Sequence, residues 1–67
     1  MDPIQSAVMY AGTLGARIRN FSSSGFSATF LTRESVDLYI EMVRDVPVSV
    51  TISSEVSVVV SAISTNA

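Results

Sequence analysis

The chain has 67 residues, of which 48% are hydrophobic and 15% charged, and its formal net charge is −2 at pH 7. The apolar content excludes a disordered chain, and the small net charge gives no general attraction for nucleic acid. Histidine, cysteine and lysine are absent, which removes the usual catalytic bases, nucleophiles and structural zinc ligands, so we expect no enzyme, no cofactor and no metal. Residues 1–67 should form one domain, and a chain this short buries only about 60% of its unfolded surface. With no disulfide or zinc site to stabilise it, we expect oligomerisation to do so.

The first predicted element is an amphipathic helix from about residue 3 to 19. Asp2 suits the N-cap and Pro3 the first helical position. An apolar stripe follows at helical spacing, made of Ile4, Val8, Ala11, Leu14 and Ile18. Ala7, Ala11 and Gly15 recur at steps of four, which indicates either a close crossing against another element or a helix that packing holds despite its glycines. These three small residues are therefore interface candidates.

A loop is predicted at residues 20–25 and a short strand at about 26–31. The serines from Ser22 to Ser24 precede a glycine, and no phosphate-binding spacing surrounds them, so a plain turn is favoured over a phosphate cradle or a phosphorylation site. Phe26 and Phe30 alternate with polar residues, which points both rings at the core.

A second helix is predicted from about residue 33 to 45, with Thr32 as its cap and Pro47 as its stop. One side carries an acidic stripe of Glu34, Asp37, Glu41 and Asp45. Because two arginines on the same helix can pair with these acids, a solvated face is favoured over a divalent-cation site or a site for a basic partner. Leu38 and Met42 flank the stripe and are interface candidates, since apolar residues beside charges are typical of an interface.

The strongest pattern is the alternation of β-branched residues with serine and threonine over residues 46–63, which predicts strands at about 46–53 and 56–63. In a hairpin that opposes Ile52 to Val56 and Val50 to Val58, the apolar residues share one face. Val59 and Ile63 then lie on the reverse face, without cover, and are interface candidates. The turn has no glycine, so a single long strand paired with another chain stays an alternative. Residues 64–67 are expected to fray.

These elements predict a small α+β domain with the order α-β-α-β-β. Its three-stranded sheet would carry the C-terminal hairpin, with the last strand at the edge, be packed by two helices, and be completed by oligomerisation. Residues 1–33 have a net charge of +2 and residues 34–67 a net charge of −4, which favours packing between opposite halves within or between chains.

The predicted function is a non-enzymatic, self-associating interaction or assembly module, such as a small structural subunit of a larger complex or particle. One alternative is a membrane-surface protein that binds through the N-terminal amphipathic helix, and another is a weak nucleic-acid binder that uses Arg17, Arg19 and Arg33. No secretory signal or membrane-spanning run is recognised, which favours a soluble intracellular protein. The partner is not specified by any motif.

Overall fold

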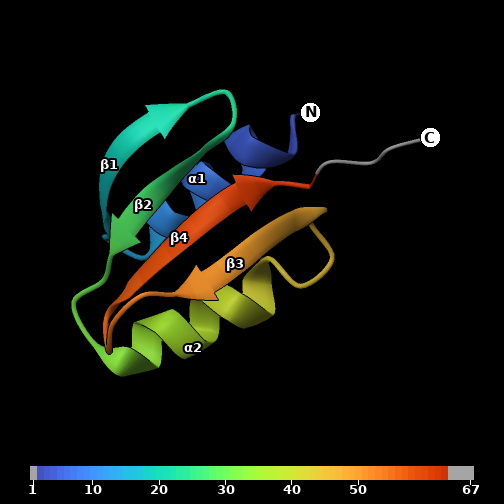
Figure 1. Cartoon of the computed structure of the whole chain (residues 1–67). Coiled ribbons are helices and arrows are strands. Elements are labelled where there is room, and N and C mark those ends of the chain that lie inside the picture. The colour runs from blue at the N-terminus through green and yellow to red at the C-terminus, as the bar shows by residue number, and fades with distance from the viewer. Residues whose placement is uncertain (1, 64–67) are drawn as a thin grey trace.

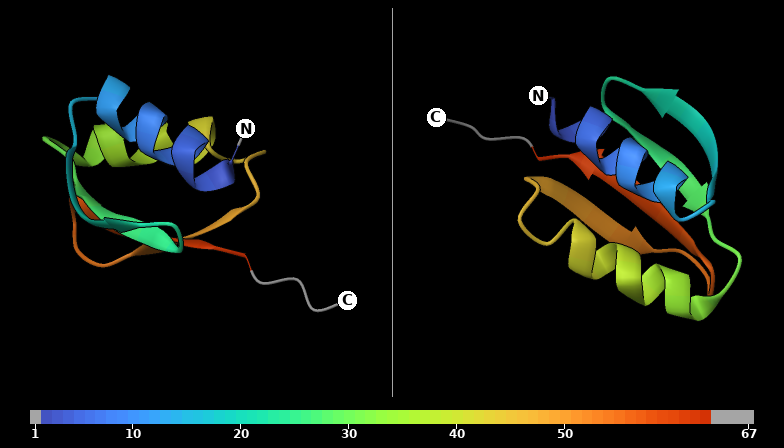
Figure 2. Two further views of the ribbon diagram at one scale, coloured as in Figure 1. Left: turned by 90° about the horizontal axis from the view of Figure 1, so that it is seen from above. Right: turned by 180° about the vertical axis from the view of Figure 1, so that it is seen from behind.

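The computed structural model describes residues 2–63, which form two helices and one four-stranded antiparallel sheet (Figure 1). The elements are α1 (Pro3–Thr13), β1 (Arg17–Ser22), β2 (Gly25–Thr29), α2 (Arg33–Met42), β3 (Val48–Ile52) and β4 (Ser57–Ala62). Both helices cover the same face of the sheet (Figure 2). The α+β class is confirmed, but the predicted three-stranded sheet and the order α-β-α-β-β are wrong. The predicted tail, residues 64–67, lies outside the described residues.

Helix α1 begins at the predicted cap, where the Asp2 carboxylate accepts a hydrogen bond from the Ile4 amide at 3.0 Å. It ends at Thr13, so the predicted helix over 3–19 is too long. Gly15 has a φ of +77° and follows the C-cap, and the amides of Gly15 and Ala16 donate to the carbonyls of Gly12 and Ala11, each at 3.0 Å. This is the Schellman arrangement, in which a left-handed glycine closes a helix. Gly15 therefore stops the helix instead of packing within it.

The residues beyond this stop form the strand that the sequence reading missed. β1 pairs with β2 through a two-residue turn at Ser23 and Ser24, and a bulge at Asn20 and Phe21 interrupts the ladder. Asn20 has a φ of +57°, a left-handed conformation that asparagine tolerates better than most residues. The loop predicted at 20–25 is thus mostly strand.

The C-terminal hairpin is confirmed, although its register and position differ from the prediction. Ile52 opposes Val58 and Val50 opposes Val60, a shift of two residues from the predicted pairs. Because a two-residue shift keeps every side chain on its face, the valines still point toward the helices. The sheet order is β1-β2-β4-β3, so β3 lies at one edge and β4 in the interior, whereas the prediction placed the last strand at the edge. Every neighbouring pair is antiparallel; short turns join β1 to β2 and β3 to β4, whereas β2 and β4 are separated in the sequence by α2 and β3.

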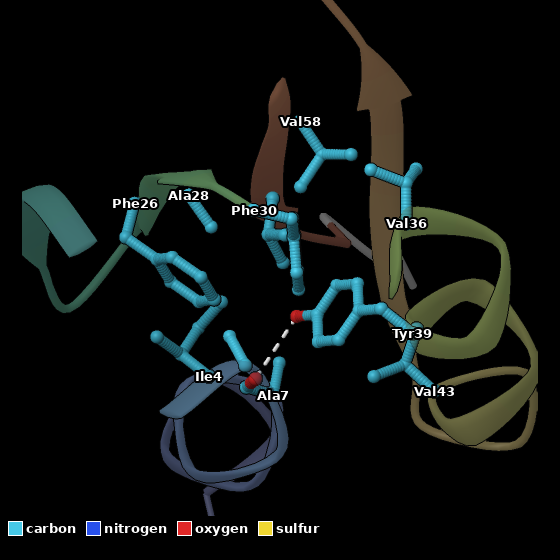
Figure 3. Packing of buried hydrophobic residues seen from close by; sticks show 11 residues of the cluster. Ile4, Ala7, Phe26, Ala28, Phe30, Val36, Tyr39, Val43 and Val58 are labelled. Atoms are coloured by element: carbon cyan, nitrogen blue, oxygen red, sulfur yellow. Dashed lines mark hydrogen bonds between the residues drawn. The ribbon is translucent and has the colours of Figure 1, made fainter. Parts of the chain in front are cut away.

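Helix α2 begins after its predicted cap, with the Thr32 hydroxyl accepting from the Ser35 amide at 3.2 Å, and ends three residues before the predicted boundary. The core between the helices and the sheet consists of apolar side chains around Tyr39 (Figure 3). The Tyr39 hydroxyl donates to the Ala7 carbonyl oxygen at 2.9 Å, and the Tyr39 ring lies 5.1 Å from that of Phe30. Burial raises the pKa of Tyr39 to about 12, because the charged phenolate would lose its hydration.

Candidate functional site

The face of the sheet opposite the helices is lined mainly by small hydroxyl side chains. Its members follow from the strand registers, since paired residues share a face and the helix-side residues alternate with them. They are Arg17, Arg19, Ser27, Thr29, Ser49, Thr51, Ser57, Val59 and Ser61. Val59 is the one apolar side chain among them and is 38% exposed at the centre of the face.

The two outer strands, β1 and β3, each have one edge without a pairing strand in the described sheet. The Ser53 amide donates to the Ser57 carbonyl oxygen at 2.9 Å. Because the amides of an antiparallel strand alternate in direction, the backbone amides of Ser49 and Thr51 also point toward β4. The amides of Val50 and Ile52 therefore point away from β4, to the free edge. Ile52 is 44% exposed there. β3 is regular and uncharged, which makes this edge a template for another strand.

The surroundings of the two edges differ in charge. Arg17 and Arg19 lie on β1, whereas α2, the loop that follows it and the loop between β3 and β4 together carry five carboxylates against two arginines. The Arg33 guanidinium lies 3.3 Å from Asp37 on α2, the guanidinium of Arg44, just after α2, lies 3.4 Å from Glu41, and both pairs are solvent-exposed. Exposed pairs of this kind contribute roughly 0–1 kcal/mol each. The acidic stripe is thus partly neutralised, as a solvated face would be.

The predicted interface residues do not form one patch. Val59 belongs to the open face, and Ile63, directly after β4, is 51% exposed. Leu38, 53% exposed, and Met42, which is half-buried, lie on α2 in the helix layer on the other side of the sheet.

The small residues of α1 do not all serve the same purpose. Ala7 and Ala11 are completely buried in the core, where they pack against other elements of the same chain. Their small side chains let the α1 backbone approach the strands closely, which α2 does not do. Gly15 is the helix stop described above. The apolar stripe of α1, which membrane binding would use, packs against the sheet in this structure.

A shallow hollow of about 220 Å³ lies on the open face beside the serine turn. It is lined by Asn20, Ser22, Ser24, Gly25, Phe26, Ser27, Val59, Val60 and Ser61. Two of its hydroxyls, those of Ser22 and Ser24, lie 2.9 Å apart and hydrogen-bond one another. None of these described lining residues is charged, so they supply no cation of the kind that recognition of a phosphate or carboxylate group uses.

Arg17 and Arg19, proposed above for nucleic-acid binding, lie together on the open face at the β1 edge, whereas Arg33 lies on α2 in the helix layer and is paired with Asp37. Within residues 2–63, no three side chains of the metal-ligating types lie close enough to hold an ion. Nor does this part of the chain contain a helix long and apolar enough to cross a membrane.

Comparison with known proteins finds no matching family model, no similar curated protein and no similar solved structure.

Proposed function

We propose that this protein is a non-enzymatic assembly module whose copies associate through the edges of their sheets. The observation that carries the proposal is the pair of free edges, β1 and β3, which differ in charge and run in opposite directions. A second copy that places its β1 beside β3 extends the sheet antiparallel, with the helices still on one face. The outward amides of Val50 and Ile52 supply the pairing groups.

Charge favours this head-to-tail arrangement over a two-fold one. Pairing β3 with β3 would bring two acidic α2 helices together, and pairing β1 with β1 would bring four arginines together, both at an electrostatic cost. The β1–β3 contact sets Arg17 and Arg19 against the acidic side. The bulge at Asn20 restricts pairing to the first residues of β1, so each contact is small. Because such a contact joins two different surfaces, each copy keeps a free edge for the next, and the assembly grows beyond a dimer into a filament or a closed ring.

The test compares two lysine substitutions at apolar positions of similar exposure. Ile52→Lys places a charge on the β3 edge, where it repels the arginines of the next copy, whereas Leu38→Lys makes the same chemical change on α2. For the unmodified chain we expect the average mass, measured by gel filtration with light scattering, to rise with concentration. Ile52→Lys should be monomeric and Leu38→Lys should behave as the unmodified chain does.

Two results would count against the proposal. A folded monomer at micromolar concentration for the unmodified chain would remove self-association altogether. Loss of association in Leu38→Lys but not in Ile52→Lys would move the contact from the sheet edge to α2.

A nucleic-acid binder is the second candidate, because Arg17 and Arg19 are exposed on one open sheet face. It predicts salt-sensitive binding to an oligonucleotide that is abolished by Arg17→Ala together with Arg19→Ala. The membrane-surface alternative predicts gain of helix on anionic vesicles, and it requires α1 to leave the core.

A further inference from the structure

The residues of the core recur at a fixed separation of 32 positions. Every half-buried residue of the core, and every buried one except Phe30, has a counterpart of the same burial 32 residues away. The buried pairs are Ile4 and Val36, Ala7 and Tyr39, Ala11 and Val43, Phe26 and Val58, and Ala28 and Val60. The half-buried pairs are Val8 and Ile40, Leu14 and Val46, Ala16 and Val48, and Ile18 and Val50.

The backbone repeats at the same separation. Arg17 opposes Thr29 and Arg19 opposes Ser27 in the first hairpin, and adding 32 gives the observed pairs Ser49 with Ser61 and Thr51 with Val59 in the second. We call two residues 32 positions apart mates. Two backbone hydrogen bonds between the hairpins correspond, because the donor and acceptor of one are the mates of the donor and acceptor of the other. The Phe30 amide donates to the Val56 carbonyl at 2.7 Å, and the Ala62 amide donates to the Ser24 carbonyl at 2.8 Å. The chain is therefore an α-β-β unit followed by a second α-β-β unit.

The two units are related by an approximate two-fold axis. In the sheet, the axis passes between Ser27 and Val59, which are mates and oppose one another across β2 and β4. In the helix layer it passes near Ala7 and Tyr39, which are also mates and are joined by the hydrogen bond in Figure 3. Residues that meet their own mates are the mark of a two-fold interface, in which one surface contacts a copy of itself.

The symmetry is broken where two identical side chains would not fit. A tyrosine at both helix positions would overfill the space between the helices, and an alanine at both would leave it empty. The small residue of one unit and the large residue of the other fill it together. This difference lets α1 lie closer to the sheet than α2.

We infer that the surface between the two units is a two-fold association surface that also accepts the matching unit of a second copy of this chain. In such an exchanged dimer the first unit of each copy pairs with the second unit of the other. The contacts at the axis are those already present within one chain. Only the link between β2 and α2 has to change, and it is short, with Leu31 80% exposed. Short links between exchangeable units favour this kind of swapping.

The experiment places charges at the axis, on the open face, in full-length chains that also carry Ile52→Lys so that edge pairing is blocked. One variant has Ser27→Asp with Val59→Asp, and the other has Ser27→Lys with Val59→Lys. Each alone sets like charges opposite one another across β2 and β4, which is unfavourable. In an exchanged heterodimer both axis pairs become opposite charges. The matched control chain has Ser27→Asp with Val59→Lys, whose charges already attract within one copy.

The two variants are unfolded together in denaturant, refolded at high protein concentration and analysed by native mass spectrometry. We expect a heterodimer of twice the 7.1 kDa chain mass as the main species after joint refolding, and none when the folded variants are mixed. The control chain should remain a monomer after the same treatment.

Absence of the heterodimer after joint refolding would overturn the inference. Its rapid formation from folded variants would also overturn it, because a surface contact needs no unfolding. The result is independent of the edge contact proposed above, since that contact forms on mixing and is removed by Ile52→Lys.

Discussion

Alanine at Gly25 should destabilise this protein strongly, and the structure sets the size of the effect. A Cβ atom built at Gly25 meets the Val60 carbonyl oxygen well inside 3.0 Å and lies 3.1 Å from the Ser61 Cα, and both are backbone atoms of β4. No side-chain rotation relieves such a contact, so β2 and β4 must separate locally. Overpacking of this kind costs about 1–3 kcal/mol, and loss of the adjacent hydrogen bond from Ala62 to Ser24 adds about 1 kcal/mol.

The matched control is Gly12→Ala. Gly12 lies in the last turn of α1, and a Cβ there meets nothing within 4 Å. Removing a helical glycine should stabilise the protein by about 0.5–1 kcal/mol.

Thermal and urea unfolding followed by circular dichroism at one protein concentration measures both variants. Since 1 kcal/mol shifts Tm by about 4–8 °C in a domain of this size, Gly25→Ala should lower Tm by at least about 10 °C and Gly12→Ala should raise it by a few degrees. Equal stability of Gly25→Ala and the unmodified chain would refute the reasoning from close backbone approach.

Three further predictions follow from the core and the cap. The free energy of unfolding should fall by roughly 2–3 kcal/mol as pH rises from 10 to 12, because Tyr39 ionises near pH 10 in the unfolded chain and near pH 12 in the folded one. Tyr39→Phe should lack this decline and should cost about 1 kcal/mol at neutral pH. Urea unfolding at neutral pH and between pH 10 and 12 measures both effects. Val58→Ala should cost about 2–3 kcal/mol and Val59→Ala under about 1 kcal/mol in the same assay, since these neighbours lie on opposite faces of β4; equal costs would contradict the assigned faces. Asp2→Ala should cost about 1 kcal/mol through loss of the hydrogen bond from Ile4, whereas Asp2→Asn should cost much less in thermal melts.

Local signals in the sequence predicted the parts of the fold that depend on neighbouring residues. The caps Asp2 and Thr32 marked both helix starts, and the alternating valines marked the C-terminal hairpin. The predicted helix wrongly extended into β1 for a physical reason. Ile18, a strand residue, follows Leu14 by four positions, so it continues the helical spacing of the apolar residues beyond Gly15, which ends the helix. Gly15 was interpreted as a small packing residue because only its left-handed φ distinguishes a helix stop from a helix interior.

The free edges and the two-fold arrangement depend on long-range pairing, which local patterns do not contain. Val59 could be placed on the open face because alternation alone determines its side. The edge strands could not be identified from the sequence, because the prediction lacked β1, and a sheet without β1 has different outermost strands. The 32-residue repeat is present in the positions of the apolar residues. Only Ser22 and Ser54 are identical at this separation, so the repeat shows in which residues are buried and not in residue identity.

The short link between β2 and α2 also decides how this chain folds. Each hairpin joins strands that are adjacent in sequence and can close quickly, whereas β2 and β4 are separated by α2 and β3, so we expect them to meet only after both units have formed. A short link holds the two units at an effective concentration in the millimolar range. In dilute solution the docking step is therefore first-order and gives closed monomers. As the protein concentration approaches that range, docking between chains competes, and the yield of closed monomers depends on how crowded the refolding chains are.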